Sequence, residues 1–115
     1  MKQTVRGRIL IKNGNSNFHG DEILYISVRD TLRHDVDCIE LGNQNIRLRK
    51  GQQFPVDYEC TYDPSKAHMK FEQIKSIPGG ITMSARIERN EQLLFINDTS
   101  IPLSTNVDIE LVKVD

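Results

Sequence analysis

The strongest constraint on the fold is the strict alternation of apolar and polar side chains over residues 54–62. One side of an extended backbone there carries Phe54, Val56, Tyr58, Cys60 and Tyr62. Because successive side chains of a strand point to opposite faces, this pattern predicts a half-buried β-strand. Pro55 has no main-chain N–H to donate to a ladder, so it belongs at the start or the edge of that strand.

The same period of two recurs from one end of the chain to the other. Turn-forming residues separate the expected strands, which cover residues 5–12, 22–29, 36–41, 46–48, 54–62, 81–88, 93–96 and 107–112. Several short strands with turns between them are typical of a β-sandwich or small barrel. With 115 residues, the chain has the size of one domain. The sequence therefore predicts a single all-β domain over residues 1–115, a sandwich of seven to eight mainly antiparallel strands.

One segment favours a helix. Asp63 suits the N-cap and Pro64 the first helical position, and Ala67, Phe71 and Ile74 follow at helical spacing. We therefore expect one short helix or helical turn near residues 64–75, ended by the Pro-Gly-Gly sequence at 78–80.

Charge and hydropathy exclude two classes of protein. Fifteen Lys and Arg residues face sixteen Asp and Glu residues, which argues against a partner bound through its phosphates, so we expect no nucleic acid. The sequence contains no apolar run of about 18 residues, the length that a membrane-spanning helix needs. The two basic clusters are interpreted as solvated faces; they comprise Arg6, Arg8 and Lys12, and Arg47, Arg49 and Lys50.

Signs of catalysis are absent from the sequence. It contains no phosphate-binding glycine loop, nucleophile elbow or paired-histidine motif, so we predict no catalytic residue, metal site or cofactor. His19, His34 and His68 are scattered among expected loops and the short helix. Cys38 and Cys60 could form a disulfide or remain two buried thiols. A hydrolase using one of these cysteines is an alternative that an intact bridge would remove.

Apolar side chains on the second face of the strands are more informative. Leu10, Ile23, Tyr25, Leu94 and Ile96 alternate with the expected core residues. They form either an exposed patch for a partner or a surface covered by a loop, a strand end or the short helix. Arg86 shares the outward face of its strand and could pair with an acidic partner. The predicted partner-binding residues are Ile23, Tyr25, Arg86, Leu94 and Ile96.

An ordered series of short motifs supports a family assignment. The series comprises Phe54-Pro55-Val56, Tyr62-Asp63-Pro64, Ala85-Arg86-Ile87, the stretch from Leu93 to Thr99, and Pro102-Leu103; the strands that begin at Val5 and Leu24 precede it. From about Val5 to Val114 the chain resembles the bacterial envelope lipoprotein family of YbaY-like proteins and YscW-type pilotins of type III secretion. The long polar stretch from Lys66 to Pro78 and the two cysteines favour the pilotin branch.

The resemblance implies a non-enzymatic escort with a small all-β sandwich fold. Pilotins of this kind are outer-membrane lipoproteins that bind the C-terminal segment of a secretin, take it to the outer membrane and promote ring assembly. We expect a monomer at the periplasmic face of the outer membrane. The sequence is interpreted as a mature domain without the signal peptide and the lipid-bearing cysteine.

Several alternatives stay open at this point. The secretin segment could add as a strand to a sheet edge or lie as a helix in an apolar groove. The chain could instead be a YbaY-like lipoprotein of general role or a carrier of a small lipid or ligand.

Overall fold

The structure, a computed structural model, describes residues 2–12, 17–31, 39–67, 70–77, 79–97 and 101–114. Its strands are β1 (Gln3–Ile11), β2 (Ile23–Asp30), β3 (Ile39–Arg47), β4 (Val56–Tyr62), β5 (Ile81–Arg89), β6 (Gln92–Ile96), β7 (Ile101–Pro102) and β8 (Ile109–Lys113). A 3₁₀ turn, η1 (Pro64–Lys66), and one helix, α1 (Phe71–Lys75), lie between β4 and β5.

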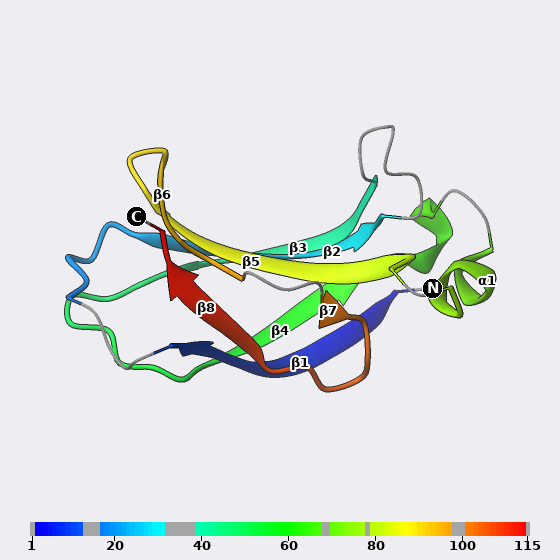
Figure 1. Ribbon diagram of the computed structural model, residues 1–115, viewed down its shortest axis with the longest axis horizontal. Coiled ribbons are helices and arrows are strands. Elements are labelled where there is room, and N and C mark those ends of the chain that lie inside the picture. Colours follow the sequence, from blue (N-terminus) through cyan, green and yellow to red (C-terminus); the bar gives the residue numbers. More distant parts are fainter. Residues whose placement is uncertain are drawn as a thin grey trace.

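The strands form one sheet that folds over on itself. Their order is β3-β2-β5-β6-β8-β1-β4, with β7 paired to β5. Figure 1 shows β2, β3 and β5 in one layer and β1, β4 and β8 in the other. The β6–β8 pair joins the layers through Phe95 and Ile96. The prediction of an all-β fold is confirmed. The sheet is mixed, because β1 and β8 run parallel, and it forms a nearly closed barrel.

The core lies between the two layers and is built by the predicted alternation. Side chains that are fully or almost fully buried include Val5, Ile9, Leu24, Ile26, Tyr58, Cys60, Ile87, Ile109 and Leu111. The Tyr58 hydroxyl donates to the Val107 carbonyl oxygen at 2.5 Å. This bond ties the segment before β8 to the inside of the β1–β4 layer, because Tyr58 lies opposite Gly7 in the ladder.

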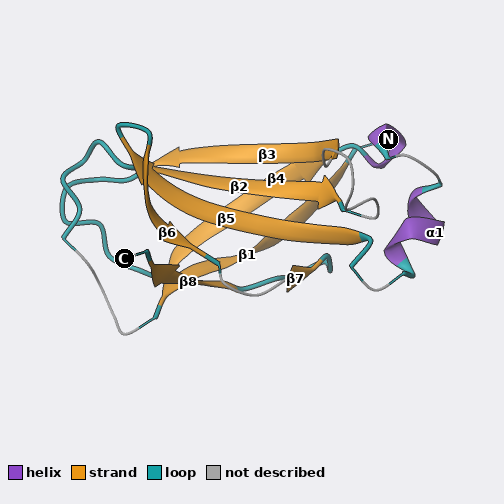
Figure 2. Ribbon diagram, turned by 45° about the horizontal axis from the view of Figure 1, so that its top comes forward, coloured by secondary structure: helices purple, strands orange, loops and turns teal. Residues whose placement is uncertain are grey.

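The predicted helix near residues 64–75 is two shorter elements. The Asp63 carboxylate accepts from the Ser65 N–H at 3.0 Å and starts η1, and the described helix α1 begins at Phe71. Phe71 and Ile74 of α1 are buried, and Figure 2 shows the helix at one end of the strands. No helix among the described residues is long and apolar enough to cross a membrane.

The strands expected at 36–41 and 46–48 are one strand, β3; residues 36–38 lie outside the described part of the chain. Asn43, Asn45 and Arg47 are exposed, so half of β3 carries polar side chains. A shift in register at Val28/Arg29 interrupts its alternation further. Because of these two features, the alternation of apolar and polar residues does not reveal one continuous strand.

The main chains of the two edge strands, β3 and β4, come into contact at Gly42. The Asp63 N–H donates to the Leu41 carbonyl oxygen at 2.9 Å. A Cβ on Gly42 would lie 2.2 Å from the Thr61 carbonyl oxygen, which is far inside van der Waals contact. The absence of a side chain at position 42 therefore allows the β3 and β4 main chains to touch and the sheet to close.

Replacing Gly42 with alanine tests this closure. The added methyl group must push the two main chains apart, and overpacking of this kind costs about 2 kcal/mol. We expect Gly42→Ala to lower the free energy of unfolding by about that amount in urea titrations followed by circular dichroism. Asn43→Ala is the matched control, because Asn43 is an exposed neighbour on the same strand. Equal stability of the two variants would contradict the account.

A buried carboxylate shapes the loop that leads into β2. Glu22 is 1% exposed and accepts hydrogen bonds from the main-chain N–H groups of His19, at 2.9 Å, and Gly20, at 3.0 Å. Burial disfavours its ionised form, but these N–H donors outweigh burial and lower the pKa of Glu22. The Glu22 main-chain oxygen also accepts from the Leu48 N–H at 3.0 Å, so the residue ties two loops together.

Glu22→Gln places an amide N–H₂ group against main-chain donors, and we expect it to cost about 1–3 kcal/mol near pH 7. Because the folded-state pKa of Glu22 lies below its unfolded value, the carboxylate stabilises the fold above the unfolded pKa. That contribution is lost as the pH falls through the folded-state pKa. Urea unfolding of wild type and variant from pH 7 to pH 3 therefore gives a stability difference that shrinks on acidification. A constant difference would argue against the ionised Glu22.

Candidate partner-binding surface

The outward face of β2, β5 and β6 carries a row of side chains aligned by the ladder. Tyr25 lies opposite Arg86, and Arg86 lies opposite Ile96. The row continues to Val112 of β8, which lies opposite Ile96. Every member is half-buried. The ladder therefore brings together Tyr25, Arg86 and Ile96, which the sequence predicted to face outward. We call these three residues the outer row.

Arg86 is held firmly within the outer row. Its guanidinium carbon lies 4.6 Å from the centre of the Tyr25 ring, a cation–π arrangement. Its Nε donates to Glu88, two residues along the same face. The Arg86 and Glu88 side chains are 35% and 24% exposed, so both are partly withdrawn from water. A guanidinium has five N–H donors, and those on the terminal nitrogens can still take a carboxylate.

Ile23 extends the surface by one row. It pairs with Glu88, and Glu88 pairs with Leu93 of β6. Ile23 and Leu93 are half-buried and flank the Arg86–Glu88 pair. A hollow of about 160 Å³ adjoins the outer row on its β3 side, between Tyr25, Ser27, Asn43, Asn45 and Arg86. The surface thus combines apolar side chains with one anchored cation.

Leu94 does not join this surface. Register shifts between Ile87 and Glu88, so Phe95 pairs with Ile87 and Leu93 with Glu88. Leu94 is the extra residue, and it packs against the core. Simple alternation missed this bulge, and so assigned to Leu94 the outward place that Leu93 holds. The two-residue hairpin next to it, with positive φ at Asn90 and Glu91, has the form of a regular type I′ turn and gives no sign of the bulge.

Leu10 lies apart from the other predicted residues. It belongs to β1 in the second layer, where it pairs with Glu110 of β8. The outward apolar residues therefore occupy two different layers, and only those of β2, β5 and β6 form one surface.

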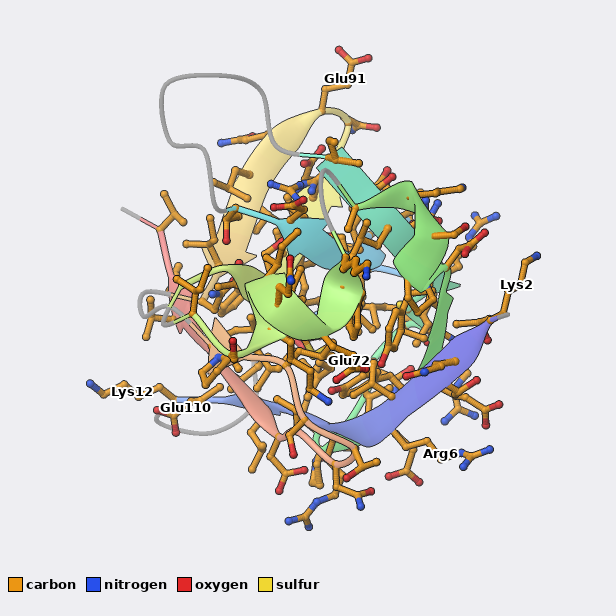
Figure 3. The ribbon with its side chains drawn as sticks, turned by 90° about the vertical axis from the view of Figure 1, so that its right-hand side faces the viewer. Lys2, Arg6, Lys12, Glu72, Glu91 and Glu110 are labelled. Carbon is orange, nitrogen blue, oxygen red and sulfur yellow. The ribbon has the colours of Figure 1, made fainter. Side chains whose placement is uncertain are left out.

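The first basic cluster forms exposed ion pairs. Arg6 Nε lies 3.1 Å from Glu59 Oε2, and an Arg8 terminal nitrogen lies 3.0 Å from Asp108 Oδ2. Figure 3 shows Arg6 pointing away from β1 into solvent. These carboxylates neutralise the arginines, as expected of a solvated face.

The cysteine chemistry considered above finds no support at position 60. Cys60 has no disulfide partner among the described residues; its thiol is fully buried on the inward face of β4, and burial raises its pKa to about 11. It is therefore protonated at neutral pH and a poor nucleophile. Cys38, like His34 and His68, lies outside the described residues, and its pairing with Cys60 stays a prediction. No three of the described His, Cys, Asp and Glu residues gather as a metal site would require.

A solved structure of another protein has the same fold. A solved structure, an alternative pilotin from the type II secretion system of Vibrio cholerae, superposes with a TM-score of 0.77. The match covers 100% of this chain and 99% of that chain at 20% identity, and it shows a common fold. A search of curated proteins found no match.

A family comparison covers almost the whole sequence. Residues 1–113 match the family described as type III secretion system lipoprotein chaperone, YscW. That family is non-enzymatic, and its description as a lipoprotein indicates a place in the cell envelope. The chain therefore belongs to the YscW family of type III secretion system lipoprotein chaperones.

Proposed function

We propose that this protein is a pilotin that binds the C-terminal segment of a type III secretion secretin, takes it to the outer membrane and promotes its assembly into a ring. The single observation that carries the proposal is the family match over residues 1–113. The proposal places the protein at the periplasmic face of the outer membrane, held by an N-terminal lipid.

The outer row is the proposed contact surface. Tyr25 and Ile96 offer apolar contacts on either side of Arg86, and aromatic and arginine side chains dominate many protein interfaces. Arg86 needs little further ordering, because Tyr25 and Glu88 already hold its side chain. A partner carboxylate could share the guanidinium with Glu88. This arrangement favours an apolar segment that carries an acidic group.

Calorimetric titration with a synthetic peptide of the cognate secretin's C-terminal segment tests the proposal. We expect wild-type protein to bind, and Arg86→Glu to weaken binding at least about tenfold, because the reversed charge repels an acidic segment and removes the stack on Tyr25. Tyr25→Ala should weaken binding by a similar factor.

Leu10→Ala is the matched control, since Leu10 is a half-buried apolar residue of the other layer; its affinity should stay within about twofold of wild type. Thermal unfolding of each variant guards against loss of the fold. Absence of binding by the wild-type protein would sink the proposed function. Equal affinity of all variants would remove the outer row from it.

A further inference from the structure

The two edges of the folded sheet, β3 and β4, form a seam that is only partly closed. The Leu48 N–H donates to the main-chain carbonyl oxygen of Glu22. Because hydrogen-bonded and non-hydrogen-bonded pairs alternate along an antiparallel ladder, this bond identifies which residues of β3 bond to β2. By that alternation Asn43 and Asn45 direct their main-chain N–H and C=O groups away from β2. The Glu59 N–H likewise points away from β1, toward Gln44, so Asp57 presents its main-chain groups to the seam as well.

One half of the seam is closed by direct contact. There the Asp63 N–H reaches the Leu41 carbonyl oxygen at 2.9 Å, and Gly42 lets the main chains touch. Asp63 directly follows β4, and no ladder pairs β3 with β4 among the described residues. Figure 2 shows β4 running at an angle to β3, so the two strands separate along their length.

The other half of the seam is open. A hollow of about 430 Å³ lies there, lined by Arg6, Gly7, Gln44, Asp57, Tyr58 and Glu59. Gln44 is on the core side of β3, opposite Ile26, an unusual place for an amide. Its Oε1 accepts the Glu59 N–H at 2.9 Å. This side-chain carbonyl stands where the main-chain carbonyl of a neighbouring strand would bond.

We propose that an extended stretch of the partner segment adds as a strand at the open half of the seam, pairing with the main chain of β3 at Asn43 and Asn45. The inference rests on the proposed function and supplies its binding mode. An unpaired edge offers alternating donors and acceptors, which an extended main chain matches and a helix does not. Asn43, Asn45 and Asp57 are exposed, so a strand can approach from solvent.

The two faces of the added strand meet different surroundings. Side chains on its inner face meet the hollow, whose lining combines Gly7 and Tyr58 with charged residues of β1 and β4. Side chains on its outer face lie near Asn45, next to Tyr25 of the outer row in the ladder. One partner segment can therefore use the seam and the outer row together.

A proline on the seam edge tests strand addition. Asn45→Pro removes the seam-facing N–H and leaves the β2–β3 hydrogen bonds in place, as proline does on natural edge strands. We expect this variant to bind the secretin peptide at least about tenfold more weakly than wild type. Asn45→Ala is the matched control, because it loses the same side chain but keeps the N–H, so Asn45→Pro should bind at least about tenfold more weakly than Asn45→Ala. Wild-type affinity in Asn45→Pro would overturn the inference.

Amide hydrogen exchange of the wild-type protein gives an answer that does not depend on the variant folding. Saturating peptide should slow exchange at Asn43 and Asn45 at least about tenfold, with little change at Gln44 and Tyr58, whose N–H groups already bond within the sheet. Binding without this protection would overturn strand addition and leave the proposed function standing. Failure of the peptide to bind would remove both. Protection that rises with protein concentration alone would mean that a second copy of this chain occupies the seam, and would also overturn the inference.

Discussion

The contact between the β3 and β4 main chains at Gly42 is the constraint on which the two-layer shape depends. The strand order leaves these two strands as the edges of one long sheet, and open edges are a liability in any β protein. Folding the sheet brings them together, and the hydrogen bond from Asp63 to Leu41 joins them. Any side chain at position 42 would occupy the space that the Thr61 carbonyl holds.

Closure at that point also determines what the rest of the sheet can present. Because the strands cross at an angle, contact at Leu41 and Asp63 leaves the stretch around Gln44 and Asp57 apart. No layer formed by the described residues covers the outward faces of β2 and β5 (Figure 1). Arg86 is ordered there by neighbours on its own face, Tyr25 and Glu88. The protein thus offers an anchored cation on a sheet face and unpaired main chain at a sheet edge.

Much of this architecture follows from the amino-acid sequence. The alternation over residues 54–62 predicted β4 and its buried face, and Pro55 at its start agrees with an edge strand. Period alone could not reveal where register shifts. The bulge that turns Leu94 toward the core depends on pairing with β5. The same holds for the seam, because the partner of Gln44 is a main-chain N–H of a strand fifteen residues away.

The outer row was predicted in part for the same reason. Tyr25 and Arg86 lie within regular strands, so alternation was sufficient to assign their faces. Their contact required the order of the strands, which depends on how the layers close and not on local pattern. Leu93 and Val112 complete the surface only through pairing across β6.

Nuclear magnetic resonance cross-saturation from a bound secretin peptide to the labelled protein identifies the side chains that the peptide touches. We predict that saturation reaches Tyr25, Arg86 and Ile96 first among the outward-facing side chains. Transfer centred on Leu10 and the outward face of β1, or on α1, would contradict it.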